Sequence, residues 1–277
     1  MKIIISHDVD HMTAWEHSKD LIIPKFVLRA LIEWGLGYIS GSEVKNRLLS
    51  LVTNKWNQIE ELMAFDRYHG IPSTFFIGIS NGCYLSYGND TAGAWIKRIK
   101  EQGFDVGVHG IAYEAVGAMM EECRIFQKMS GLDAFGIRMH YLRTATDTIH
   151  NLAEIGYVFD TSEPALKHPY KIGCLWEFPL HVMDGNIFCN GARWQTRNLE
   201  EARQATKERL EQAIAAGIPY FTLLFHDRYY SDDFKTWRDW YVWFVTHCKE
   251  LGIDFRSYRD AIAELEGHGT SRVRVLS

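Results

Sequence analysis

Short apolar segments alternate with segments of helical periodicity along most of the chain. Uninterrupted apolar or β-branched runs predict strands at 2–6, 73–79, 104–109, 135–139, 157–160, 175–183, 186–190, 220–227 and 253–257. Apolar residues that recur every three or four positions predict helices at 57–70, 92–103, 113–131, 146–156, 198–217 and 232–252. Alternation of apolar strands with helices is typical of a parallel sheet covered by helices, either open or closed into a barrel.

One long apolar stretch, residues 21–40, lies outside this alternation. Pro24, Lys25, Arg29 and Glu33 interrupt it, so it falls short of a helix that spans a bilayer. We expect an amphipathic helix that packs on the body of the protein. A peripheral membrane contact and a lid over the substrate are the alternatives.

Composition narrows the class of protein. The 277 residues are 47% hydrophobic, which suits one large α/β domain or two small ones. The formal charge of −5 argues against nonspecific binding of nucleic acid, which requires basic stripes. Five scattered cysteines without C-x-x-C spacing indicate a reduced, cytoplasmic protein, and because the first predicted strand begins at Lys2 we expect no signal peptide. The sequence carries no indication of the oligomeric state.

Polar side chains gather where the predicted strands end. Five strands end in residues of this kind: Asp8 and Asp10, His109, Arg138 with His140 and Tyr141, Asp160, and His226 with Asp227. The carboxyl ends of parallel strands meet at one edge of a sheet or barrel, which is where active sites gather. We therefore expect one shared polar site.

The chemistry of this site follows from the first strand. Asp8 and Asp10 are two residues apart, so their carboxylates point to the same face and repel each other unless a cation intervenes. A metal ion on one and Arg138 on the other would compensate both charges. His109 is a natural second ligand in a site for zinc or a similar divalent ion, and His226 is then free to titrate.

The motifs "SHDVDH", "DVGVHG", "GIRMHYL", "VFDTS" and "TLLFHD" resemble, in order and spacing, those of the polysaccharide deacetylase family, carbohydrate esterase family 4. The branch with "DVDH" is similar to deacetylases of surface-polysaccharide or O-antigen biosynthesis. The resemblance implies a distorted (β/α) barrel of about seven parallel strands and removal of acetyl groups from N-acetyl sugars with a divalent metal. It covers residues 3–260, so we expect a single domain over 1–277 with a helical insertion at 11–56.

Residue by residue, the resemblance implies that Asp8 is the general base and that Asp10 and His109 bind the metal. The arginine that orients the base corresponds to Arg138. The general acid corresponds to His226.

Asp160 is the candidate for the aspartate that tunes this acid. The metal is expected to be zinc, with cobalt, nickel, manganese and iron as alternatives.

The chain departs from the family pattern at the third ligand. The second histidine of the family's H-x-x-x-H motif falls on Tyr113, a poor metal ligand. His11 is the first candidate to replace it, because a chain that turns after Asp10 lets both side chains face one ion. His140 is the second candidate, and His11 could also be a polar residue that starts a loop.

Substrate-binding residues are less well specified. His140 and Tyr141 follow the arginine, and Asp184 belongs to a segment, 175–185, that either lines the pocket rim or forms an edge strand with a turn at 184–185. The predicted function is metal-dependent hydrolysis of an N-acetyl amide on a sugar or polysaccharide precursor. The alternatives are a catalytically silent, carbohydrate-binding relative and a two-metal phosphoesterase, which would need a bridging carboxylate and more histidine ligands.

Overall fold

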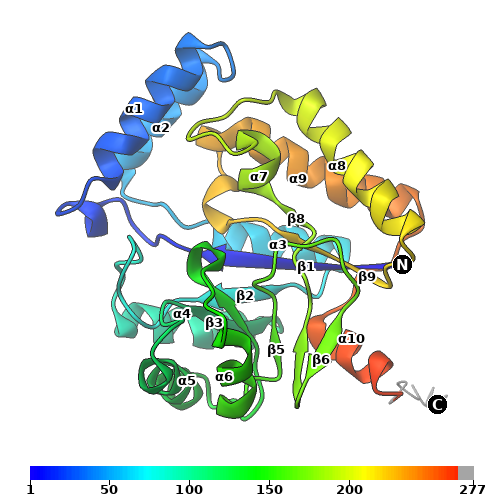
Figure 1. The fold of residues 1–277 in the computed structure, drawn as a ribbon. Helices are drawn as coiled ribbons and strands as arrows, with labels where there is room; N and C mark the ends of the chain where they lie inside the picture. Colours follow the sequence, from blue (N-terminus) through cyan, green and yellow to red (C-terminus); the bar gives the residue numbers. More distant parts are fainter. Residues whose placement is uncertain (268–277) are drawn as a thin grey trace, which may run out of the picture.

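A single curled sheet organises the computed structural model, which describes residues 1–267 (Figure 1). Its nine strands lie in the order β6-β7-β5-β4-β3-β2-β1-β9-β8, and every neighbouring pair is parallel except β6 with β7. The strands are β1 (Lys2–Val9), β2 (Thr74–Ile77), β3 (Asp105–Gly110), β4 (Ile137–Met139), β5 (Phe159–Asp160), β6 (Tyr170–Ile172), β7 (Leu175–Glu177), β8 (Val182–Met183) and β9 (Tyr220–Leu224). The sheet forms a half-barrel, which confirms the predicted α/β class and distorted barrel.

Helices follow most of the strands and cover the sheet. They are α1 (Ile22–Gly35), α2 (Gly41–Thr53), α3 (Ile59–His69), α4 (Asn89–Glu101), α5 (Val116–Ser130), α6 (Thr148–Ile155), α7 (Asp184–Cys189), α8 (Leu199–Ala215), α9 (Lys235–Glu250) and α10 (Tyr258–Leu265). Helices α1 and α2 form a hairpin that projects from one side of the molecule (Figure 1). Within residues 1–267, no helix is both long and apolar enough to cross a membrane.

Two predicted strands are not strands in the structure. Residues 186–190 lie largely in helix α7, where the Phe188 ring stacks on Trp237 at 4.5 Å between centroids. A short apolar run does not distinguish a buried helical turn from a strand, which explains this error. Residues 253–257 pair with the sheet through one bridge alone, between Phe255 and Ile3.

Strand β1 divides its side chains between the two faces of the sheet. Ile3, Ile5 and Val9 belong to the main core beneath the helices, whereas Ile4 belongs to a smaller core on the other face. His7 follows the odd-numbered residues, and its Nε2 lies 2.9 Å from the Asp66 carboxylate on α3. Because side chains alternate along a strand, the even-numbered residues that end in two aspartates face the concave side.

Aromatic rings fill the smaller core on the concave face. Its buried members are Ile4, Phe76, Phe159, Phe178, Tyr220, Tyr258 and Ala261. Glycines on the neighbouring strands make room for these rings: a Cβ on Gly107 would lie 2.6 Å from the Phe76 ring and 2.9 Å from the carbonyl oxygen of Gly136. The rings therefore require glycine at this position of β3.

We predict that Gly107→Ala lowers the free energy of unfolding by about 1–3 kcal/mol, because the added methyl overpacks a rigid region of the core. Urea denaturation measures the change. Gly93→Ala is the matched control: Gly93 lies within α4, and a methyl group added to it would have no neighbouring atom within 4 Å, so alanine should raise stability by about 0.5–1 kcal/mol. Equal effects of the two substitutions would contradict this packing.

Candidate active site

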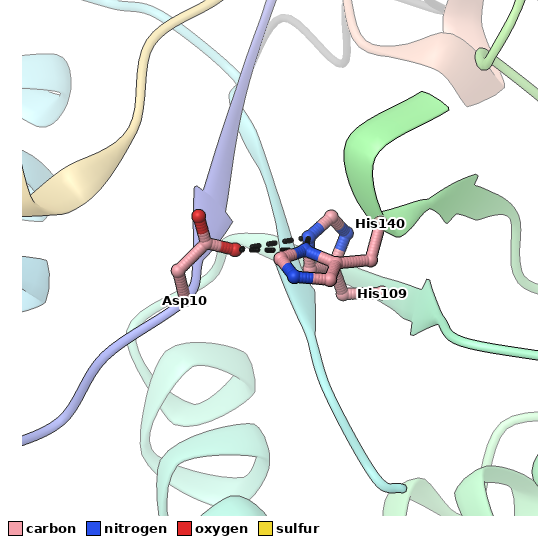
Figure 2. Close-up of side chains that lie close together, drawn as sticks. All are labelled: Asp10, His109 and His140. Atoms are coloured by element: carbon pink, nitrogen blue, oxygen red, sulfur yellow. Dashed lines mark hydrogen bonds and ion pairs between the residues drawn. The ribbon is translucent and has the colours of Figure 1, made fainter. Parts of the chain in front are cut away.

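Three potential metal ligands converge at the ends of β1, β3 and β4 (Figure 2). The Nε2 atom of His109 lies 3.0 Å from Asp10 Oδ1 and 2.9 Å from the Nδ1 atom of His140. His140 Nδ1 in turn lies 3.3 Å from Asp10 Oδ1. One carboxylate oxygen and two imidazole nitrogens form a donor set suited to zinc and similar divalent ions.

The outer nitrogens of both rings are already engaged by backbone carbonyls. His109 Nδ1 lies 3.2 Å from the carbonyl oxygen of Arg138, and His140 Nε2 lies 3.0 Å from that of Cys83. A carbonyl only accepts, so each outer nitrogen carries a proton and each inner nitrogen keeps a lone pair for a metal. Burial alone would raise the pKa of Asp10, but hydrogen bonds that His109 and His140 donate when a proton takes the place of the metal hold that pKa well below its ordinary value. The residues present therefore fit a divalent ion.

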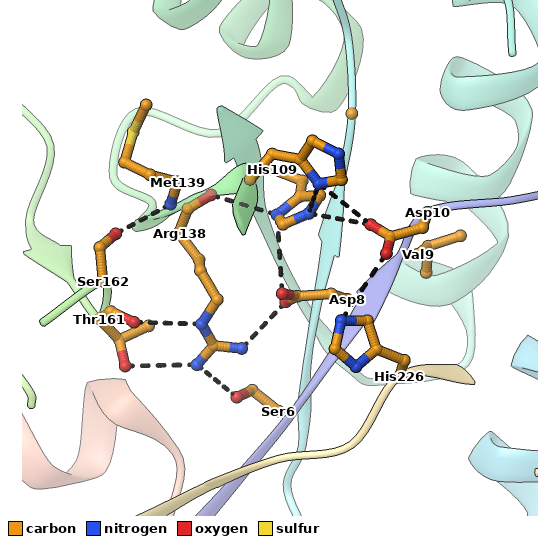
Figure 3. Close-up of polar contacts among 12 residues, drawn as sticks. Ser6, Asp8, Val9, Asp10, His109, Arg138, Met139, Thr161, Ser162 and His226 are labelled. Carbon is orange, nitrogen blue, oxygen red and sulfur yellow. Dashed lines mark hydrogen bonds and ion pairs between the residues drawn. The ribbon is translucent and has the colours of Figure 1, made fainter. Parts of the chain in front are cut away.

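Asp8 lies beside this set, held by an arginine (Figure 3). Arg138 Nη1 donates to Asp8 Oδ1 at 2.9 Å, and both side chains are buried. The second oxygen of Asp8 lies 3.8 Å from His109 Nδ1, so the carboxylate reaches toward the metal ligands without joining them. The predicted pairing of one aspartate with Arg138 and of the other with the metal ligands agrees with this geometry.

His226 follows β9 and faces the site from the opposite side. Its Nδ1 donates to Asp184 Oδ1 at 2.9 Å, while its Nε2 lies 3.7 Å from Asp10 Oδ2. Burial would lower the pKa of His226, but the negative charge and hydrogen bond of Asp184 outweigh it and raise that pKa to about 10. The imidazole is therefore cationic in this arrangement, with Nε2–H turned toward the site.

Asp184, rather than Asp160, is the aspartate that contacts His226. The sequence pattern predicts a rim or turn position for Asp184, whereas it is a fully buried residue in the first turn of α7. Its second oxygen also accepts the backbone N–H of His226 at 2.6 Å. The one local signal for this role is an acidic residue before a short apolar run, a pattern that is equally typical of a turn.

Asp160 instead braces the loop that carries His140. Its Oδ1 accepts the Ser162 hydroxyl at 2.6 Å, and Ser162 Oγ accepts the backbone N–H of Met139 at 2.8 Å. Burial raises the pKa of Asp160 and, with the neighbouring carboxylate, that of Glu177. The two carboxyls interact side chain to side chain, which requires a shared proton.

The third ligand position differs from the first expectation. His11 turns away to His17, whose Nε2 lies 2.8 Å from His11 Nδ1, and His140 takes its place. Adjacent side chains of an extended chain point in opposite directions, which separates His11 from Asp10 unless the chain turns between them. The guanidinium carbon of Arg143 lies over the Tyr113 ring, 5.0 Å from the ring centroid.

Two strained turns hold His140 in place. Tyr141 and Leu142 have φ values of 57° and 53°, and the facing turn has Cys83 and Tyr84 at 49° and 73°. Left-handed conformations of bulky residues are costly and concentrate at functional sites. The first turn leaves Tyr141 61% exposed with its ring 4.1 Å from that of His140, a suitable position to meet a substrate.

Solved structures with a similar fold include two polysaccharide deacetylases and an allantoinase. A polysaccharide deacetylase structure from Mycobacterium smegmatis matches with a TM-score of 0.64 and 15% identity, over 99% of this chain and 93% of that one. A polysaccharide deacetylase from Pseudomonas aeruginosa matches with a TM-score of 0.60 and 14% identity, over 95% and 89%. The PuuE allantoinase matches with a TM-score of 0.61 and 13% identity, over 96% and 90%.

Neither a protein-family model nor a curated protein sequence matches the chain. The resemblance to polysaccharide deacetylases is thus confirmed at the level of the fold. This chain has the α/β fold that solved polysaccharide deacetylases share with an allantoinase.

Proposed function

We propose that the protein is a metal-dependent hydrolase that removes the acetyl group from an N-acetylated sugar or polysaccharide precursor. The proposal rests on the position of one ligand set, Asp10–His109–His140. It lies between the carboxylate that is hydrogen-bonded to Arg138 (Asp8) and the imidazole that is hydrogen-bonded to Asp184 (His226). Hydrolysis of an amide requires a base for water and an acid for the departing amine, and both are present beside the ligands.

A divalent ion on these ligands would polarise the acetyl carbonyl and acidify a water molecule. Asp8 takes the proton of the attacking water as general base. Arg138 fixes the orientation of this carboxylate, because its Nη1–H donates to one Asp8 oxygen and leaves the other turned to the site.

His226 protonates the departing amine. Its Nδ1–H stays on Asp184, so the transferable proton is on Nε2, which faces Asp10. A cation on Asp10 would cancel part of the negative charge that raises the pKa of His226, and would bring that pKa closer to the range in which an acid catalyst works best.

Three finer features belong to the same proposal. Zinc is the first choice of metal because two imidazoles and a carboxylate form one of its common catalytic ligand sets. A cytoplasmic location is supported by five free cysteines. Tyr141 is the candidate contact for the sugar. The rival function is that of a silent carbohydrate-binding relative. It is disfavoured because His140 can serve as the third metal ligand in place of the family histidine that is Tyr113 here.

Release of acetate from N-acetylated sugars and their oligomers tests the function. Asp8→Asn should keep the metal and lower turnover by about 100-fold or more, because only the base is lost. Asp10→Asn and His140→Ala should each lose one equivalent of bound metal together with turnover. Tyr113→Phe is the matched control, with metal and turnover unchanged. No acetate from the metal-loaded wild type on any substrate would favour the silent relative.

The pair His226–Asp184 gives a pH-dependent prediction in the metal-free protein. The folded-state pKa of His226, about 10, exceeds the usual pKa of about 6.5. The contribution of this pair to the free energy of unfolding is therefore complete below about pH 6.5. It is lost as the pH rises through about 10. Asp184→Asn should lower the His226 titration midpoint observed by NMR and flatten this loss of stability. A midpoint that does not move in the variant would contradict the pairing.

A further inference from the structure

A second group of metal-ligand side chains lies on the loop directly after β1. His17 is fully buried, and its Nε2 lies 2.8 Å from His11 Nδ1 and 3.3 Å from Glu16 Oε1. The donor atoms of these three residues lie within 4.8 Å of one another, as do those of the candidate catalytic set. Each group contains two imidazole nitrogens and one carboxylate oxygen.

The surroundings of His17 orient it as a ligand. Its Nδ1 lies 2.8 Å from Asp20 Oδ2, and the other oxygen of Asp20 accepts the backbone N–H of Ile22 at 2.8 Å. A carboxylate on the outer nitrogen is the usual partner of a metal-binding histidine. One proton on His17 Nε2 could satisfy either His11 or Glu16, whereas a metal ion would satisfy all three groups.

We propose that His11 Nδ1, Glu16 Oε1 and His17 Nε2 bind a second divalent transition-metal ion. Both oxygens of Glu16 also accept backbone N–H groups, from Met12 at 2.9 Å and from Thr13 at 3.1 Å. An ion here would therefore fasten the loop that leaves the active-site strand. The donor set is again typical of zinc, and the proposal does not depend on any catalytic activity.

Zinc content after equilibrium dialysis and the zinc-dependent rise in melting temperature test this site. The wild type should bind two equivalents, Asp10→Asn one, His17→Gln one, and the double variant none. In Asp10→Asn the melting temperature should still rise with zinc, and this rise should disappear when His17→Gln is added. His150→Gln, at an exposed position on α6, is the control and should bind two.

One equivalent in the wild type, absent from Asp10→Asn, would overturn the second site. Two equivalents in His17→Gln would overturn it as well. Since Asp10→Asn keeps the second ligand set intact, its zinc content remains informative even if His17→Gln does not fold.

The α1–α2 hairpin buries an ion triad and exposes apolar side chains, the reverse of the usual arrangement in a water-soluble helix pair. One group of its charged side chains faces the protein: Glu33 is buried and pairs with Arg29 at 2.7 Å and with Arg47 at 2.6 Å. Arg47 also donates to the carbonyl oxygen of Asp233 at 2.9 Å. Burying such an ion triad carries a large desolvation cost, so this face of the hairpin is committed to the body of the protein.

The outer face of the hairpin is apolar. We define it by its exposed large side chains, of which Val52 is 78% and Leu48 43% exposed: Leu28, Leu31, Trp34, Leu36, Leu48, Leu49 and Val52. A groove of about 460 Å³ runs between Trp34 and the side chains of α2 on this face. Contiguous exposed apolar surface of this kind marks a contact with a membrane or another protein.

The charges of the hairpin distinguish between these occupants. Over residues 21–55, all of which the structure describes, the exposed charged side chains are lysines, Lys25, Lys45 and Lys55, and no Asp or Glu is exposed. This is the opposite of the net charge of −5 for the chain. A symmetric contact with a second copy would bring the same lysines toward each other, whereas an anionic lipid surface attracts them.

We infer that the apolar face of the hairpin docks onto the surface of an anionic membrane, with its leucines and Trp34 in the interface and the lysines among the headgroups. Lys25 Nζ lies 2.9 Å from the Tyr84 hydroxyl, on the turn whose Cys83 carbonyl holds His140. This contact joins the start of α1 to the turn beside the candidate active site.

Co-sedimentation with vesicles tests the docking. The wild type should bind vesicles of phosphatidylcholine with about one-third phosphatidylglycerol, and bind pure phosphatidylcholine more weakly. Leu48→Glu combined with Val52→Glu should reduce binding at least 10-fold. Met120→Glu is the matched control: Met120 is 56% exposed on α5, and its replacement should leave binding unchanged.

Light scattering in the absence of lipid tests the alternative, in which a second copy of the chain covers the apolar face. A monomeric wild type that binds anionic vesicles supports the inference. A wild-type dimer that Leu48→Glu with Val52→Glu converts to monomers would assign the face to a second copy. Absence of vesicle binding, equal binding to both kinds of vesicle, or binding unaffected by the double substitution would also overturn it.

Discussion

One buried guanidinium, that of Arg138, holds the concave face of the sheet together. Its Nη1 donates to Asp8, its Nη2 to the Ser6 hydroxyl at 2.7 Å, and its Nε to the carbonyl oxygen of Thr161 at 3.1 Å. The Tyr258 hydroxyl on α10 lies 3.1 Å from Nη2, so this side chain connects strands β1 and β4, the loop after β5 and the last described helix. A buried charge without these partners would be strongly destabilising, which makes the arrangement mutually dependent.

Arg138 pairs with only one of the two aspartates at the end of β1. Asp8 pairs with the permanent cation of Arg138, while Asp10 contacts His109 and faces His226. The two carboxylates share one face of a strand but have different partners. The difference in environment is the basis of the different roles that we propose for them.

The period of two along β1 made the common face of Asp8 and Asp10 predictable, and the need to compensate their charges predicted Arg138 for one of them. The third ligand was less accessible, because whether His11 or His140 faces Asp10 depends on how the chain leaves two strands. The left-handed turn at Tyr141 is such a feature. No local propensity identifies it.

The partner of His226 was missed for a related reason. Asp160 and Asp184 are both acidic residues beside short apolar runs, and their roles depend on where α7 packs against β9. Strands of two residues, such as β5 and β8, carry too little pattern to be ordered in a sheet. Long-range packing rather than local sequence therefore decides which aspartate reaches the histidine.

The proposed activity requires that Asp10, His109 and His140 together bind the metal. Crystals of the protein grown with cobalt and measured at the cobalt absorption edge test it directly. We expect an anomalous peak within about 2.3 Å of Asp10 Oδ1, His109 Nε2 and His140 Nδ1, at ordinary coordination distances. A cobalt ion that binds Asp10 with His11 while His140 points away, or no peak among these three residues, would contradict it.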